Sequence, residues 1–321
     1  MNYYDNKEYV SNSMLNWLDI SPKYLLYKLK RNSEEVETKA LENGKLLHSY
    51  IEDPSKFIVS EIENPGGKTG DFLEAYAKVK DVEKAKEMSN MGYTVKKLTE
   101  LLEDKRNRDY LNFIQLSEGK IALTRDQKIA IDGAIASLHS NKYSADLLFT
   151  DPLMHESKNE LEVYFESIVN RGTSSVKRKA KLDKVTIDHV NKVIKVTDLK
   201  TTTKNAMGKF YPLNNQVKTG FIQKDYYYDG WFASFINFGY YRQAAYYVDA
   251  VKHIYFDLID KGYTVEFYFI VVRLDTSFDV AVYRTSQATL NYGHSDVNNL
   301  LNKYRSTIID GIDHNQEIYE I

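Results

Sequence analysis

The hydrophobic pattern of the chain changes near residue 160 from helical spacing to strict alternation. Apolar residues alternate with polar ones from 161 to 166, which predicts a half-buried strand. Two more strands are predicted at 176–187 and 192–199, with a turn at 188–191 between them. Three consecutive strands are expected to form a sheet, and the apolar face of a sheet must be buried against other elements. This change in pattern therefore constrains the fold more than any other feature of the sequence.

Helical patterns lie on both sides of this three-stranded segment. Ser11 to Ser13 can cap a short helix, and a capping box at Thr124 and Gln127 precedes a longer one. The expected helices are 14–20, one that starts at Ser21-Pro22, 35–51, several within 71–115, 129–139, 239–261 and 287–309, and two further strands are expected at 265–273 and 278–283. The predicted fold class is α/β, with a central mixed sheet flanked by helices and a helical N-terminal region. We expect a mostly helical part at 1–150 and the sheet at 151–321, in one integrated domain.

The composition excludes several classes of site. The 321 residues contain no cysteine, so disulfides, thiolate zinc sites, iron–sulfur clusters and a cysteine nucleophile are excluded. No apolar run approaches the roughly 18 residues of a transmembrane helix, and the first residues lack the pattern of a secretory signal. These features predict a cytoplasmic protein that does not enter a membrane.

The charge is distributed unevenly along the chain. The net charge is only -2, yet residues 171–209 contain eleven lysines and arginines and three aspartates. A basic segment in an otherwise acidic chain suggests that a polyanion is bound at one place. The alternative is a solvated, lysine-rich hairpin without a ligand.

The third predicted strand ends in Asp198-Leu199-Lys200. Residues two apart on a strand share a face, so the carboxylate and the ammonium lie on the same side. If the chain turns at 188–191, Asp183 on the preceding strand can converge with Asp198. Two close carboxylates repel each other unless a cation neutralises them, and oxygen ligands favour Mg²⁺ or Mn²⁺. The alternative is a surface Asp–Lys pair with little effect on stability.

Two helical motifs add polar groups. Gly44 and His48 are four residues apart in a predicted helix, as are Gln243 and Tyr247, so each pair shares one helix face. Histidine is a common metal ligand, and an amide next to a phenol can brace a site or contact a sugar–phosphate chain. The alternatives are a packing glycine with a hydrogen-bonded histidine, and an amphipathic helix with buried tyrosines.

Taken together, these motifs resemble the RecE/RecB-like nucleases of the PD-(D/E)xK superfamily, and in particular exonucleases of the RecE, or exonuclease VIII, type. The matching segments follow the order of that family: 10–15, 21–24, 43–48, 52–57, 182–184, 198–202 and 243–247. The glycine usual near the first aspartate is absent, because Lys181-Leu182-Asp183 stands there. Residues 66–120 resemble no part of the family.

The resemblance implies a role for each matching residue. Asp183 and Asp198 would bind metal together with His48 and the backbone carbonyl of Leu199, and Lys200 would be the catalytic lysine. The family also uses a glutamate on the preceding strand; Glu160 and Glu162 both qualify by alternation, and Glu160 is preferred. The residues expected to contact DNA or support the site are Gln243, Tyr247, Lys179, Lys181 and Lys204.

The resemblance also implies an activity. We expect an Mg²⁺- or Mn²⁺-dependent exonuclease that degrades linear double-stranded DNA from 5′ to 3′ in phage-type recombination. It would form a ring-shaped homo-oligomer and work with a single-strand annealing protein. Two alternatives stay open: a RecB-like endonuclease or nuclease module of a replication or repair complex, and a DNA-binding protein of the same fold without turnover.

Overall fold

The computed structural model divides the chain into two compact units, one formed by residues 1–44 and 134–321 and the other by residues 45–133. Helices α3 (Lys39–Glu52) and α8 (Arg125–Ser140) each run from one unit into the other. The unit that contains the sheet includes residues 1–44 as well as the C-terminal part of the chain, and the expected division at residue 150 stays a prediction. The structure describes residues 3–30, 39–60, 62, 65–117, 119–150, 155–169, 172, 174–208, 210–212, 221–223, 226–275, 277–309 and 311.

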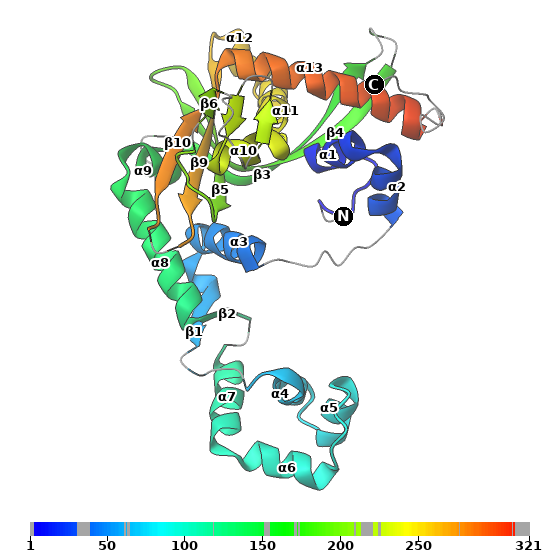
Figure 1. Cartoon of the computed structure of the whole chain (residues 1–321), viewed down its shortest axis with the longest axis vertical. Coiled ribbons are helices and arrows are strands. Elements are labelled where there is room, and N and C mark those ends of the chain that lie inside the picture. Colours follow the sequence, from blue (N-terminus) through cyan, green and yellow to red (C-terminus); the bar gives the residue numbers. More distant parts are fainter. Residues whose placement is uncertain are drawn as a thin grey trace. The chain divides into compact units, whose positions relative to one another are not determined.

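The first unit is built on a five-stranded mixed sheet with the order β10-β9-β5-β4-β3 (Figure 1). Its strands are β3 (Glu156–Val169), β4 (Ser174–Asp188), β5 (Val193–Thr202), β9 (Thr264–Arg273) and β10 (Val280–Arg284). Neighbouring strands are antiparallel except for β5 and β9, which are parallel. A parallel pair needs a long crossover connection, and here the chain between β5 and β9 supplies three helices. The predicted α/β class with a mixed sheet is confirmed.

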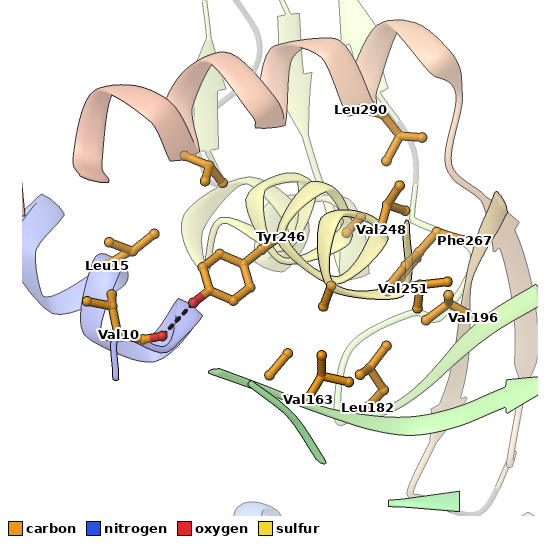
Figure 2. Packing of buried hydrophobic residues seen from close by; sticks show 14 of the residues in the cluster. Val10, Leu15, Val163, Leu182, Val196, Tyr246, Val248, Val251, Phe267 and Leu290 are labelled. Atoms are coloured by element: carbon orange, nitrogen blue, oxygen red, sulfur yellow. Dashed lines mark hydrogen bonds between the residues drawn. The ribbon is translucent and has the colours of Figure 1, made fainter. Parts of the chain in front are cut away.

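Helices cover the sheet of the first unit. The crossover contributes α10 (Gly230–Asn237), α11 (Tyr240–Ile254) and α12 (Phe256–Asp260). The remaining helices of this unit are α1 (Asn12–Ile20), α2 (Pro22–Lys30), α9 (Lys142–Leu148) and α13 (Gln287–Tyr304). Figure 2 shows α11 between the sheet and α13, with Tyr246, Val248 and Val251 among the buried residues. The strands contribute Leu182, Val196 and Phe267 to the same core, so α11 is fixed against the centre of the sheet.

A small three-stranded sheet with the order β6-β8-β7 lies in the crossover between β5 and α10. Its strands are β6 (Phe210–Pro212), β7 (Phe221–Gln223) and β8 (Tyr226–Tyr228). The two ends of this segment meet closely, because a Cβ added at Gly208 would lie 2.5 Å from the Asp229 carbonyl oxygen. Glycine is therefore required where the chain leaves and re-enters the main fold.

The second unit is mostly helical and has its own small core. It contains β1 (Phe57–Ser60) and β2 (Ile121–Thr124), which pair in parallel. Helices α4 (Gly67–Val79), α5 (Val82–Met88), α6 (Val95–Glu103) and α7 (Lys105–Leu116) bury Phe72, Leu73, Leu98 and Leu111 together. The predicted capping box is present: the Thr124 N–H donates to Gln127 Oε1 at 2.9 Å, and the Gln127 N–H donates to Thr124 Oγ1 at 3.1 Å.

The elements differ from the expected ones in a few places. The helix predicted at 239–261 is divided into α11 and α12 by Tyr255, whose backbone is not helical. The predicted start of the helix at 35–51 lies outside the described residues, which begin again at Lys39. The β1–β2 and β6–β8 strands were not predicted, because runs of three or four residues carry too little periodicity. No helix among the described residues combines the length and the apolar character that crossing a bilayer requires.

Candidate functional site

Asp183 and Asp198 face each other at the end of the pairing between β4 and β5. The last registered pair is Lys184 with Thr197, so the two aspartates occupy the next opposing positions. The Leu199 N–H donates a hydrogen bond to Asp183 Oδ2 at 3.0 Å, which joins the β4 carboxylate to β5 beside Asp198. The structure therefore brings the two predicted carboxylates together where the strands separate.

Asp198 is almost fully buried, with 1% of its surface exposed. Its Oδ1 accepts a hydrogen bond from Gln243 Nε2 of α11 at 2.7 Å, and its Oδ2 lies 2.6 Å from Lys200 Nζ. A buried carboxylate needs this kind of compensation, because an unpaired charge in the interior is strongly unfavourable. The Asp-x-Lys motif thus forms an ion pair within one strand, and α11 supplies the third group.

Lys200 is held in its charged form by its surroundings. Burial disfavours the ammonium, but Asp198, Tyr240 and Asp183 outweigh burial and raise the pKa of Lys200 above its ordinary value. Its Nζ also lies 5.0 Å from the centre of the Tyr240 ring, a cation–π distance. Lys200 is therefore a fixed positive charge beside the carboxylates rather than a general base.

Tyr247 lies one helical turn after Gln243, and the carboxylates of Asp198 and Asp183 affect the pKa of its phenol. Burial raises its pKa well above the ordinary value, and the charges of Asp198 and Asp183 raise it further. The phenol thus keeps its proton and remains a hydrogen-bond donor near the two acids. The Gln-x-x-x-Tyr pattern places both polar groups on the face of α11 that meets the sheet.

Glu160 lies across from Asp183 in the β3–β4 ladder. The registered pairs on either side are Asn159 with Lys184 and Leu161 with Leu182, so Glu160 and Asp183 occupy the interrupted position between them. Glu160 has a positive φ of 49°, which marks a local distortion of the strand. Its side chain forms an ion pair with Lys181. Glu162 is registered with Lys181, two residues farther along the ladder from Asp183, and the role of either glutamate in the site stays a prediction.

Gly44 permits a close contact between α3 and the end of β5. A Cβ added at Gly44 would lie 2.6 Å from Thr201 Oγ1, so no larger residue fits without movement. Thr201 follows Lys200 directly, so the glycine of the Gly-x-x-x-His motif lies next to the end of β5. His48 belongs to the second compact unit, and its role as a metal ligand stays a prediction.

The donor atoms fit a hard divalent cation. No group of three or more histidine, aspartate or glutamate side chains is assembled for metal binding among the residues that the structure describes. The two carboxylates, and the carbonyl of Leu199 that directly follows Asp198 on β5, are all oxygen donors. Mg²⁺ typically binds one or two carboxylates and retains several waters, so this donor set suits it without a larger cage.

The three lysines expected to contact DNA lie in different environments. Lys179 is buried, and its Nζ donates to the carbonyl oxygens of Tyr3 and Asn6 at 2.5 and 2.6 Å. This placement differs from the prediction, because the ammonium is used within the fold and does not face a polyanion. Lys181 pairs with Glu160, and Lys204 is exposed after β5. Whether either of them contacts DNA stays a prediction.

Most other cations of the basic segment 171–209 also have partners within the fold. Lys177 pairs with Glu8, Lys195 with Asp188 at 3.3 Å, and buried Arg178 with Asp249 at 3.1 Å. Lys184 is buried and donates to the Leu148 carbonyl. Arg171 and Lys209 lie outside the described residues. The charge count therefore overstated the exposed basic surface, because several of these cations are buried or bind acids and carbonyl groups within the fold.

Tyr240 is a site residue that sequence reasoning missed. It lies three residues before Gln243, so helical spacing places both on one face of α11. Its ring contacts Lys200 and stacks on Trp231, with ring centres 6.0 Å apart. The spacing was visible in the sequence, but a tyrosine in a tyrosine-rich chain gives no signal until its neighbour is known.

Comparisons with known proteins support the fold but not a family. No protein-family model matches the chain, and no curated protein matches it. The fold is similar to a crystal structure from Eubacterium rectale that is described as a candidate exonuclease, with 14% identity and a TM-score of 0.53 over 99% of this chain and 92% of that one. A solved structure named SSO0001 covers 78% of this chain and 82% of its own at 13% identity, but its TM-score of 0.24 carries no argument. The chain thus has a fold similar to that of a candidate nuclease.

Proposed function

We propose that this protein is a metal-dependent deoxyribonuclease. The observation that carries the proposal is the convergence of Asp183, Asp198 and Lys200 at one point of the sheet, with Gln243 donating to Asp198. Two carboxylates next to a fixed ammonium match the needs of phosphodiester hydrolysis, where negative charge develops on the phosphate. The similarity of the fold to a candidate exonuclease supports the same conclusion.

Each residue of the site has a distinct part in this proposal. Asp183, Asp198 and the Leu199 carbonyl would hold Mg²⁺ or Mn²⁺, with His48 as the further ligand that the family resemblance implies. The bound ion would supply Lewis-acid polarisation of the phosphate and a more acidic water. Lys200 offsets negative charge on the phosphate, and its raised pKa keeps it protonated at neutral pH. Gln243 fixes the orientation of the Asp198 carboxylate.

Among nucleases, the resemblance favours an exonuclease that acts on linear double-stranded DNA. We propose degradation from 5′ to 3′, a ring-shaped homo-oligomer and a single-strand annealing protein as partner, as in phage-type recombination. An enzyme of this kind needs a free DNA end, whereas an endonuclease does not. This difference in substrate makes the proposal testable with DNA of defined topology.

The test is digestion of end-labelled linear duplex and covalently closed circular duplex, each with Mg²⁺, Mn²⁺ or EDTA. We expect the linear duplex to be degraded from its ends with either metal, the circle to survive, and EDTA to stop the reaction. Rapid cutting of the circle would identify an endonuclease. If neither DNA is cut with either metal, the protein binds DNA without turnover or has another function.

A further inference from the structure

A short N-terminal strap, residues 3–10, lies along the part of β4 that precedes Asp183. Val10 pairs with β4 through two backbone hydrogen bonds, from its N–H to the Lys177 carbonyl at 2.9 Å and from the Lys179 N–H to its own carbonyl at 2.8 Å. Strand β3 occupies one edge of β4, and β5 pairs with β4 only from Lys184 onward. The strap therefore pairs with β4 where β5 does not, and its paired position, Arg178, lies five residues before Asp183.

The strap is fixed in place by side chains of α11 and β4. The Tyr246 hydroxyl donates to the Val10 carbonyl at 2.5 Å, as Figure 2 shows. Lys179 Nζ donates to the carbonyls of Tyr3 and Asn6, and Lys177 pairs with Glu8. These contacts hold the start, the middle and the end of the strap against β4.

Four tyrosines form a continuous aromatic surface on the strap and β3, here called the tyrosine shelf: Tyr3, Tyr4, Tyr9 and Tyr164. The ring centre of Tyr3 lies 5.3 Å from that of Tyr4 and 6.3 Å from that of Tyr164, and the rings of Tyr9 and Tyr164 are 5.1 Å apart. Tyr3 is buried, but Tyr4 is 70% exposed and Tyr164 is 39% exposed. The shelf thus has a buried base and two rings open to solvent.

The shelf borders the candidate active site along β4. Lys181 Nζ lies 5.8 Å from the centre of the Tyr4 ring and pairs with Glu160, which lies across from Asp183. Lys181 is also two residues before Asp183 on the same strand. Lys181 therefore links the shelf to the strand position of Asp183.

We propose that the tyrosine shelf stacks unpaired bases at the DNA end that enters the active site; this inference rests on the proposed nuclease function. Aromatic side chains stack any base, because every base has a π face, and such stacking is a main source of affinity for single strands. Lys177 and Lys181, which lie beside the shelf, pair with Glu8 and Glu160, so charge alone does not make this surface attractive to a duplex. Stacking on the tyrosine rings therefore favours an unpaired base over a base within a duplex.

The test measures stacking directly, in the Asp183→Asn background with Mg²⁺ so that no strand is cut. The probe is a duplex with a short overhang that carries 2-aminopurine at the unpaired terminal position, compared with a blunt duplex of the same length. We expect binding to quench the probe. We expect Tyr4→Ala to reduce the quenching and to weaken overhang binding roughly tenfold, with blunt-duplex binding unchanged. Tyr4→Phe should retain both properties.

Matched controls separate stacking from folding. Tyr292 on α13 is also exposed, at 59%, so Tyr292→Ala should change neither quenching nor affinity. Tyr164→Ala provides a second shelf variant and should act in the same direction as Tyr4→Ala. If quenching and affinity are unchanged in both Tyr4→Ala and Tyr164→Ala, the tyrosine shelf does not stack bases, while the nuclease proposal is unaffected. If the Asp183→Asn protein binds neither the overhang duplex nor the blunt duplex, both the base-stacking proposal and the proposed nuclease function are contradicted.

Discussion

The carboxylate of Asp183 on β4 accepts a hydrogen bond from the backbone N–H of Leu199 on β5, at 3.0 Å. This bond lies just beyond the last registered pair of the two strands. It fixes a carboxylate from one strand beside Asp198 on the next, where the registered pairing of the two strands ends.

Replacement of Asp183 by Asn should separate metal binding from folding. The amide oxygen can still accept from Leu199, so we expect the fold to persist, while the loss of charge weakens cation binding. In the unmodified protein, Mg²⁺ at about 100 times its dissociation constant should stabilise the fold by about 2.7 kcal/mol. Thermal unfolding with and without Mg²⁺ measures this gain, which should largely disappear in the variant. An unchanged response to Mg²⁺ would place the metal elsewhere.

Lys200→Ala should abolish most of the nuclease activity. The ammonium is fixed beside the carboxylates, and loss of one preorganised electrostatic group typically lowers the rate by about 10²–10³-fold. Lys195 lies on the same strand and also pairs with an aspartate, Asp188, so Lys195→Ala is the matched control and should retain activity. Initial rates on labelled linear duplex measure both variants. If Lys200→Ala and Lys195→Ala cleave DNA at comparable rates, Lys200 has no role in catalysis.

Gln243→Leu should weaken metal binding more than it weakens the fold. The side chain donates to Asp198 Oδ1 at 2.7 Å, and loss of a partner that orients a metal ligand typically costs about 10–100-fold in affinity or activity. The Mg²⁺ concentration that gives half-maximal activity should rise accordingly. Gln287→Leu on α13 removes a surface hydrogen bond to Asn291 and should have no such effect. An Mg²⁺ dependence equal to that of the unmodified protein contradicts the orienting role.

Gly44→Ala should destabilise the fold, and a second substitution should restore it. The new Cβ would lie 2.6 Å from Thr201 Oγ1 but 3.7 Å from Thr201 Cβ. We expect Gly44→Ala to lower the free energy of unfolding by about 1–3 kcal/mol, as overpacking typically does. The double variant Gly44→Ala, Thr201→Ala should recover most of this loss. Gly92→Ala, where nothing lies within 4 Å, is the control. Failure of the double variant to recover stability would argue against this contact.

Asp188 should make stability depend on pH in the acidic range. Hydrogen bonds from the Asn191 side chain and backbone, with smaller contributions from Lys195, lower the pKa of Asp188 to about 2. Because the folded-state pKa lies below the ordinary value, this stabilisation is present above about pH 4 and is lost as the pH falls toward 2. Asp188→Asn should therefore be less stable at pH 7, by at most about 2 kcal/mol, but not at pH 2. Denaturant unfolding at the two pH values tests this, and a pH-independent difference would contradict it.

Local patterns in the sequence predicted most elements near the candidate site. Alternation identified β3, β4 and β5, and the turn at 188–191 made β4 and β5 neighbours, so the approach of Asp183 to Asp198 followed from the register. Side chains that interact through neighbouring strands or a single helical turn are determined by short-range geometry. Such short-range geometry can be predicted from the sequence without knowledge of the tertiary structure.

Contacts between distant segments were not predictable in the same way. The charge of Lys179 suggested a surface for DNA, yet its ammonium is buried under Tyr3 and Asn6. No local pattern shows that a strap more than 170 residues earlier returns to cover it. The contact of Tyr240 with the site likewise could not be predicted, because it depends on the position of Lys200 over its ring.

The sequence by itself determined the sheet-forming region, the Asp183, Asp198 and Lys200 set and the helix that carries Gln243, because each depends on periodicity over a few residues. The tertiary structure decided which charges remain exposed, which edge of β4 the N-terminal strap occupies, and that Gly44 meets Thr201. These features depend on packing between segments far apart in the chain, where burial and close contact select one arrangement among many that local pattern permits.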